Sequence, residues 1–189
     1  GKFNSADNPY PVSIGGVIGY SAVEAVLDGC DVQADITGAR TTSASGMYLG
    51  GLIGQMAKVK MTLKNSNVAG DIVNETATNP TKTALGGLVG LCYTNEITDC
   101  HSKMSVLNQC SVNEYVGGLV GQIEANIVTV MKDCSYSSTI TSKKAQYSGM
   151  LVGRLTHKAS STTTISGMSV KGTFNGTSLT ADNYKSYCF

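Results

Sequence analysis

The sequence predicts an all-β fold, a right-handed parallel β-helix of about five coils with three short strands in each coil and capping tails. Three observations lead to this prediction. The 189 residues include 22 glycines, three prolines and no tryptophan, and they are rich in threonine, serine, valine and isoleucine, a composition of strands and turns. A glycine-rich segment recurs five times along the chain. A second block follows each copy and carries a residue type that is suited to a sharp corner.

The glycine-rich segment has the pattern Gly-Gly-apolar-apolar-Gly, and successive copies begin 31 to 36 residues apart. Repeats with such a period are typical of solenoids and of radial arrays. We expect each copy to form one strand, whose two apolar side chains point to opposite faces, one into the coil and one under a connecting loop. The five copies are Ile14–Gly19, Leu49–Gly54, Leu85–Gly90, Val116–Gly121 and the less regular Ser148–Gly153.

The second block opens on an apolar residue and reaches its corner position two residues later. Its columns step by 36, 34, 34 and 34 residues, so the variation in length lies in the connections. Glycine, asparagine and aspartate adopt the left-handed αL conformation at the least cost, and one such residue between two strands bends the chain without reversing it. A hairpin would instead require a two-residue turn of the Asn-Gly kind. The corner column is Gly29, Asn65, Asp99, Asp133 and Gly167.

A further apolar column lies seven residues after the corner, and we expect it to form an inward-facing ladder with about 4.8 Å between rungs. Its members are Ile36, Ile72, Val106, Ile140 and Phe174. Three strands in about 34 residues suit a coil, whereas a propeller blade needs four strands and about 40 residues. A β-propeller or an array of hairpins is the alternative fold.

The repeats predict one domain that spans residues 1–189. Residues 13–175 contain the five repeats. The ends of a solenoid expose an apolar cross-section, so we expect residues 1–12 to form an N-terminal cap and residues 176–189 a C-terminal cap. The aromatic residues of the C-terminal cap are Tyr184, Tyr187 and Phe189.

Charge and hydropathy narrow the range of partners. Charged residues make up 14 % of the chain and the net charge is +1, so the basic surface that nucleic acids require is not expected. No apolar stretch approaches the roughly 20 residues of a membrane-spanning helix, so no transmembrane segment is predicted. The first residues do not resemble a signal peptide, which fits a secreted chain whose signal has been removed.

The six cysteines are better explained by packing than by metal binding. One column contains Cys30, Cys100 and Cys134, and we expect Cys100 and Cys134 to be reduced, buried and stacked on adjacent coils. The spacing is not Cys-x-x-Cys and the two histidines lie elsewhere in the repeat, so neither a metal nor another cofactor is predicted. The cysteines outside the column, where oxidation is more readily expected, are Cys92, Cys110 and Cys188.

The sequence predicts no catalytic site. His101 follows Cys100 directly, so in a strand the two side chains point to opposite faces and cannot act together. Asp31 and Asp35 belong to the densest acidic run, but Ser105 occupies the corresponding position in the third repeat, so no row of carboxylates forms. A β-helix enzyme that degrades polysaccharides is the remaining enzymatic alternative.

A tyrosine column is the candidate ligand-binding face. Tyr48, Tyr115 and Tyr147 each stand two residues before the first repeat glycine, where the other copies have Ser13 and Ala84. Such a row is able to stack against sugar rings in a carbohydrate-binding module. A row of tyrosines that covers a sheet edge or a loop is the structural interpretation.

Gly86–Gly90 with Asp99-Cys100, and Gly117–Gly121 with Asp133-Cys134, resemble the GLUG-motif repeats of large bacterial surface and secreted proteins. The resemblance covers essentially residues 13–175. It implies a non-catalytic extracellular or cell-surface module, either adhesin-like or a structural spacer, within a larger assembly. It further implies a host or cell-surface glycan or protein as the partner, and it supplies no catalytic residues.

Overall fold

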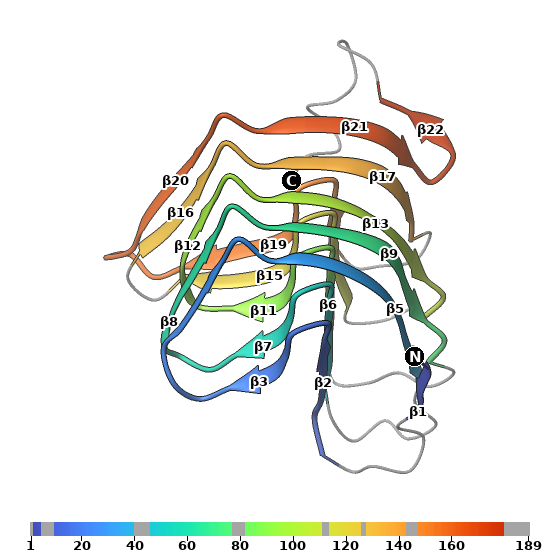
Figure 1. Cartoon of the computed structure of the whole chain (residues 1–189), viewed down its shortest axis with the longest axis horizontal. Helices are drawn as coiled ribbons and strands as arrows, with labels where there is room; N and C mark the ends of the chain where they lie inside the picture. Colours follow the sequence, from blue (N-terminus) through green and yellow to red (C-terminus); the bar gives the residue numbers. More distant parts are fainter. Residues whose placement is uncertain are drawn as a thin grey trace.

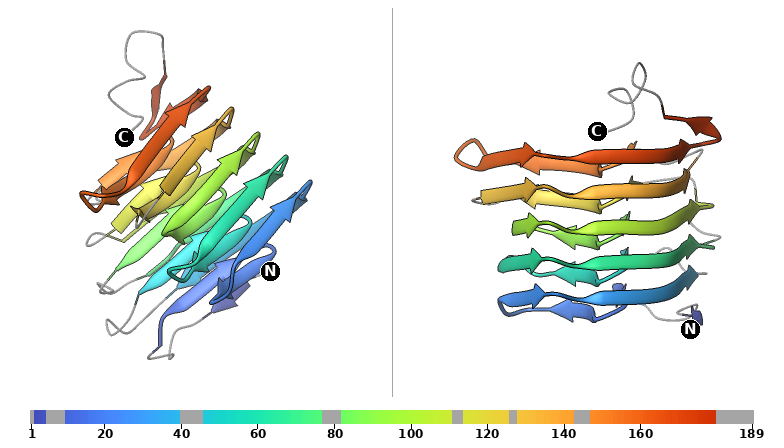
Figure 2. Two further views of the ribbon diagram at one scale, coloured as in Figure 1. Left: turned by 90° about the vertical axis from the view of Figure 1, so that its left-hand side faces the viewer. Right: turned by 45° about the horizontal axis from the view of Figure 1, so that its top comes forward.

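The computed structural model describes residues 2–4, 10–39, 46–76, 82–110, 114–125, 128–142 and 147–179. These residues form a parallel β-solenoid in which strands from the five repeats stack one above another (Figure 1 and Figure 2). The stack makes about four turns from the first repeat to the last. The predicted all-β parallel solenoid is therefore confirmed, and its right-handed winding stays a prediction. Within the described residues, no helix is long and apolar enough to cross a membrane.

Each repeat contributes one strand to each of four sheets, which we name B, C, D and A in the order in which the chain passes through them. Sheet B contains β2 (Val12–Gly15), β6 (Met47–Gly50), β10 (Thr83–Gly86), β14 (Glu114–Gly117) and β18 (Tyr147–Gly149). Sheet C contains β3 (Ile18–Ser21), β7 (Ile53–Met56), β11 (Val89–Cys92), β15 (Val120–Ala125) and β19 (Val152–His157). Sheet D contains β4 (Ala25–Asp28), β8 (Lys60–Lys64), β12 (Thr94–Thr98), β16 (Val128–Lys132) and β20 (Thr162–Ser166). Sheet A contains β1 (Lys2–Asn4), β5 (Asp31–Ala39), β9 (Asn67–Asn74), β13 (His101–Asn108), β17 (Ser135–Thr141), β21 (Ser169–Phe174) and β22 (Thr177–Ser178).

The glycine-rich segment forms two strands, and for this reason a coil has four strands instead of the predicted three. In the third repeat, β10 ends at Gly86 and β11 begins at Val89, with a bend between them. A Cβ atom at Gly86 would overlap the carbonyl oxygen of Val89 and would lie 2.5 Å from the amide nitrogen of Gly121. Because the chain bends here, Leu88 and Val89 are both buried in the core. The expectation that one of them packs under a loop is wrong.

The corner between sheets D and A has the predicted αL conformation. Its φ angles are 67°, 48°, 51°, 53° and 63° at Gly29, Asn65, Asp99, Asp133 and Gly167, respectively. The corner N–H groups still bond to the next coil, because Asn65 donates to the Thr98 carbonyl at 3.1 Å and Asp99 donates to the Lys132 carbonyl at 3.0 Å. The corner therefore changes the direction of the chain without interrupting the stacking of the coils.

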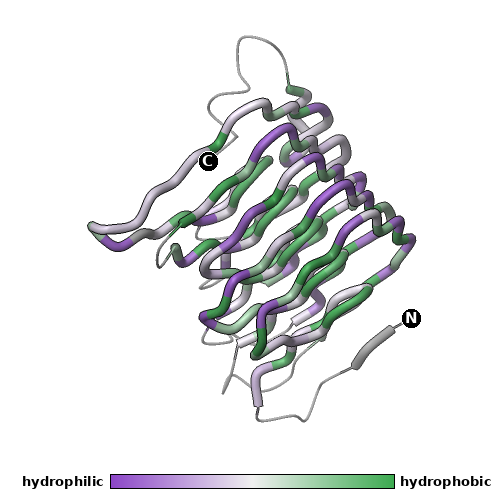
Figure 3. The backbone as a smooth tube through the Cα atoms, turned by 60° about the vertical axis from the view of Figure 1, so that its left-hand side comes forward, coloured by the Kyte–Doolittle hydropathy of each residue, from purple (hydrophilic) through white to green (hydrophobic). Residues whose placement is uncertain are grey.

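The predicted apolar ladder is also confirmed. Its residues are direct partners on successive strands of sheet A, and all of them are buried. They are Ile36, Ile72, Val106, Ile140 and Phe174. Outward side chains such as Lys103 alternate with inward ones such as Met104, as expected of a sheet with one face in solvent. Figure 3 shows the resulting alternation of hydrophobic and hydrophilic positions along the strands.

The cysteine column faces inward as well. Cys100 and Cys134 are buried free thiols. The neighbouring Cys134 thiol, together with burial, raises the pKa of Cys100. Cys92 and Cys110, which the sequence singles out for oxidation, are buried thiols that form no disulfide among the described residues, and burial raises the pKa of Cys92 to about 12. Cys188 lies outside the described residues.

Sheet A carries an additional strand at each edge. β1 pairs in parallel with β5, and β22 pairs antiparallel with β21. The two strands belong to the predicted caps at residues 1–12 and 176–189. They extend sheet A and no other sheet among the described residues. The three aromatic residues expected in the C-terminal cap, Tyr184, Tyr187 and Phe189, lie outside the described residues.

Replacing Gly86 by alanine should destabilise the fold by about 3 kcal/mol or more, because every atom that the added methyl group would meet belongs to the backbone. Gly29→Ala is the matched control. Its φ is also unfavourable for alanine, but its Cβ would meet nothing within 4 Å, so the cost should be about 1–2 kcal/mol. Denaturant unfolding of both variants measures the difference. Equal losses of stability would show that the glycine bend is not crowded.

Candidate functional site

The strands of sheets B and C leave the glycine bend in different directions (Figure 1), and the two sheets are in contact next to the bend. A Cβ atom at Gly90 of β11 would lie 2.9 Å from the amide nitrogen of Leu49 and 3.0 Å from the carbonyl oxygen of Ala84, both in sheet B. The next residue, Leu91, packs against Ala84. Two successive residues of β11 thus face sheet B, and the pairing of β11 with its neighbours skips Gly90.

We name this contact surface the B–C seam. On sheet B it consists of the column Ser13, Tyr48, Ala84, Tyr115 and Tyr147. On sheet C it consists of the column Tyr20, Gln55, Leu91, Gln122 and Arg154. The two columns touch along the stack, for example through the hydrogen bond that the Ser13 hydroxyl donates to Gln55 Oε1 at 2.9 Å.

The predicted tyrosine column exists, but its members differ in exposure. Tyr48 and Tyr115 are only 8 % and 7 % exposed, because they pack with Ala84 and Leu91 in a small apolar cluster outside the main core. Tyr147, in the last repeat, is 46 % exposed. The inner tyrosines therefore fasten sheet B to sheet C, and Tyr147 is available to solvent.

Sequence reasoning missed two further tyrosines at the seam. Tyr20 directly follows the last glycine of the first repeat and is 56 % exposed. Tyr93 packs against the cluster of Tyr48 and Tyr115. Tyr20 could have been found from the repeat alignment, because the residue after the last repeat glycine forms a column of its own. A regular alternation of inward and outward side chains does not predict that this column lies opposite the tyrosine column.

Three polar side chains interact with one another in the middle of the seam. Lys82 and Glu124 form an ion pair, and Gln122 donates a hydrogen bond to Glu124 Oε1 at 3.0 Å. Burial, with the nearby Glu124 carboxylate, raises the pKa of Tyr93 to about 12 and also raises that of Tyr48. The phenol groups therefore stay protonated at neutral pH and can donate hydrogen bonds.

Arg154 defines the chemistry of the C-terminal end of the seam. Its Nη1 donates to the Tyr115 hydroxyl at 2.6 Å. The guanidinium carbon lies 4.9 Å from the ring centroid of Tyr115 and 5.4 Å from that of Tyr147, which is within the range of cation–π attraction. The two ring centroids are 5.8 Å apart. Beside them lies a hollow of about 430 Å³ that is lined by Tyr147, Val152, Gly153, Arg154 and Leu155.

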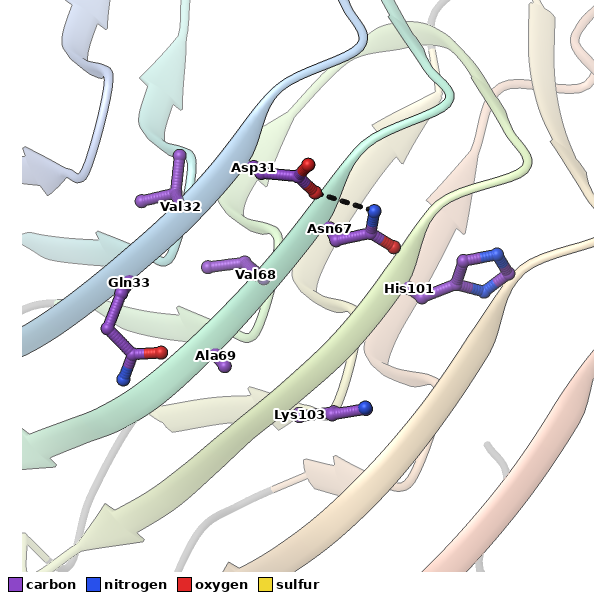
Figure 4. A pocket seen from close by; sticks show the side chains of 8 residues that line it. All are labelled: Asp31, Val32, Gln33, Asn67, Val68, Ala69, His101 and Lys103. Atoms are coloured by element: carbon purple, nitrogen blue, oxygen red, sulfur yellow. Dashed lines mark hydrogen bonds between the residues drawn. The ribbon is translucent and has the colours of Figure 1, made fainter.

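A second hollow, of about 340 Å³, lies on the outer face of sheet A (Figure 4). One row of its lining is Asp31, Asn67 and His101, and the other is Gln33, Ala69 and Lys103. Val32 and Val68 complete the lining. Asn67 Nδ2 donates to Asp31 Oδ1 at 2.7 Å, so this carboxylate is held within the ladder. The short side chain of Ala69 leaves the space between its longer neighbours.

The structure joins His101 to partners that the sequence did not suggest. Its Nδ1 lies 2.8 Å from Ser135 Oγ and its Nε2 lies 3.2 Å from Asp99 Oδ1. The Asp99 side chain is 57 % exposed, and the Ser135 N–H already donates to the Cys100 carbonyl, so that N–H is not free to stabilise an oxyanion. The contact between His101 and Ser135 links successive coils. His101 has these partners on the outer face, whereas the Cys100 side chain is buried in the core.

The acidic positions of the enzymatic alternative also bond within the ladder. The N–H of Asp71 donates to Asp35 Oδ1 at 3.3 Å, and Ser105 is the next partner of Asp71. The row of carboxylates thus ends after two rungs. In the part of the chain that the structure describes, no group of three or more His, Cys, Asp or Glu side chains is arranged to hold a metal ion.

One carboxyl group is buried inside the coil. Glu114 is fully buried, accepts a hydrogen bond from Asn108 and leaves Oε1 without a partner among the described residues. The stacked Thr83 hydroxyl is likewise unpaired there. Burial raises the pKa of Glu114. The folded protein therefore favours the protonated acid more than the unfolded chain does.

Comparisons of the chain with protein-family models, with curated proteins and with solved structures found no match. The repeat fold thus stands on the chain's own sequence and structure.

The raised pKa of Glu114 predicts how stability depends on pH. Because the folded state binds this proton more tightly, its contribution is fully present below the unfolded pKa of about 4.3 and is lost as pH rises through the folded pKa. Glu114→Gln should remove this loss and raise the melting temperature at pH 7 relative to the wild type. Melting curves of both proteins at pH 4 and pH 7 measure it. A variant less stable than the wild type at both pH values would argue against this sign.

Proposed function

We propose that the chain is a non-catalytic repeat module of an extracellular or cell-surface protein, related to the GLUG-motif repeats, and that it binds a glycan in an adhesin-like manner. The five recurring glycine segments and the two Asp-Cys pairs, Asp99-Cys100 and Asp133-Cys134, support the relationship. The continuous ladders of the solenoid support the mechanical part of the proposal, because a rigid rod holds side chains of distant repeats in fixed positions.

The observation that carries the binding role is the concentration of tyrosine at one surface. Among the described residues, four tyrosines belong to the two columns of the B–C seam and Tyr93 packs against them. The two most exposed of these tyrosines, Tyr20 and Tyr147, stand in the first and last repeats. Exposed phenol rings offer an apolar face to the C–H groups of a sugar and a hydroxyl to its polar rim. The competing proposal is that the module is a structural spacer. The burial of Tyr48 and Tyr115 favours a packing role, rather than a binding role, for these two side chains.

Tyr147→Ala tests this proposal against Tyr115→Ala. The Tyr147 substitution should weaken glycan binding and change the free energy of unfolding by less than about 1 kcal/mol, because its ring is half exposed. The Tyr115 substitution should cost about 2 kcal/mol or more, because it leaves a cavity at the seam. A glycan and host-protein array, with thermal melting as the control, gives both readouts. An intact wild-type chain that retains no ligand would favour the spacer role.

An enzyme that acts on polysaccharides is the second candidate. In its favour, the hollow on sheet A brings Asp31, His101 and Lys103 to one exposed face, as Figure 4 shows. Loss of a measured polysaccharide-degrading activity in Asp31→Asn would establish it. The absence of any such activity in the wild-type chain would remove it.

A further inference from the structure

We propose that the C-terminal end of the B–C seam binds a carboxylated sugar residue of an acidic glycan chain. Arg154 would hold the carboxylate and the ring of Tyr147 would hold the sugar face. The inference rests on the proposed function, because it names the ligand class of the same surface.

Arg154 supplies a positive charge that the described residues do not neutralise. One of its five N–H donors bonds to the Tyr115 hydroxyl, and no described carboxylate lies within ion-pair distance of it. The acid on the adjacent strand, Glu124, is paired with Lys82 and accepts from Gln122. The other donors of the guanidinium therefore have no carboxylate partner among the described residues, and an anionic ligand would supply one.

Two tyrosine rings hold the guanidinium in place before any ligand arrives. The contacts of 4.9 Å and 5.4 Å to the rings of Tyr115 and Tyr147 restrict its rotation, and the bond to the Tyr115 hydroxyl fixes one edge. A restrained side chain loses less conformational entropy on binding than a free one. Arg154 thus differs from the lysines at the outer face of the coil, whose flexible ammonium groups bind as point charges.

The hollow beside Arg154 suits a sugar ring. Its volume of about 430 Å³ accommodates one, Gly153 contributes no side chain, and Val152 and Leu155 are apolar. The half-exposed ring of Tyr147 forms one wall. A pyranose placed against this ring would bring an attached carboxylate toward the guanidinium.

The form of the site favours a carboxylate over a sulfate or phosphate. A planar guanidinium binds both oxygens of a carboxylate in a bidentate manner. Sulfate and phosphate carry a third oxygen that would need further donors, and the lining side chains other than Arg154 and Tyr147 are apolar or absent. Nucleic acid is disfavoured, because the chain carries a net charge of only +1.

Titration calorimetry of the intact chain with a tetragalacturonate, and with its methyl ester, isolates the charge from the sugar. The acid should bind at least 10-fold more tightly than the ester. Arg154→Gln should remove that preference, and Arg154→Lys should restore only part of it, because an ammonium group cannot bind a carboxylate in a bidentate manner. Lys103→Gln removes an equal charge from the hollow on sheet A and should leave the affinity unchanged. Thermal melting shows whether each variant is folded.

The outcomes separate this inference from the proposed function. Equal binding of acid and ester, with Arg154→Gln unchanged, would overturn the carboxylate site and leave glycan binding at the seam intact. A sulfated oligosaccharide or a nucleotide that binds as tightly as the tetragalacturonate would overturn the choice of ligand. A loss of affinity in Lys103→Gln would move the site to sheet A. The absence of binding to any glycan would overturn both proposals.

Discussion

The close approach of two backbones at the glycine bend determines most of this structure. Sheets B and C can meet there only because the first and last glycines of each copy have no side chain, as the positions of Gly86 and Gly90 show. The approach gives the coil its fourth strand, and it brings two columns of outward side chains face to face. The B–C seam, with its tyrosines and Arg154, is a consequence of that contact. A coil without the bend would spread the same residues over one flat face.

The sequence predicted the αL corner and the ladders because each leaves a chemical signature. A corner that needs positive φ selects glycine, asparagine and aspartate, and those residues occupy all five copies. The ladder of Ile36 and its partners follows from constant spacing. The glycine bend leaves a different signature. Gly86 and Gly87 do not have positive φ. They are required because a side chain would not fit, and not because of their backbone conformation. The same residues therefore also suit a continuous strand that contains glycines.

The candidate site was predictable only in part for a related reason. The column of Tyr48, Tyr115 and Tyr147 could be found from repeat alignment alone. Arg154 lies 39 residues from its hydrogen-bond partner Tyr115, and its column faces the tyrosines only because Gly90 and Leu91, and their equivalents, turn toward sheet B together. Period-two alternation does not contain that irregularity. The exposure of the individual tyrosines could not be predicted either, because Tyr115 is covered by the following coil whereas Tyr147 lies in the last repeat.

Proton NMR provides the most direct test of the contact between sheets B and C. The α-proton of Gly90 that occupies the place of a Cβ lies close to sheet B, because an ideal Cβ there would be 2.9 Å from the amide nitrogen of Leu49. A nuclear Overhauser effect between this α-proton and the Leu49 amide proton is therefore expected. If Gly90 showed such effects only to its equivalents on neighbouring strands of sheet C, the two sheets would not be in contact. The B–C seam would then not exist.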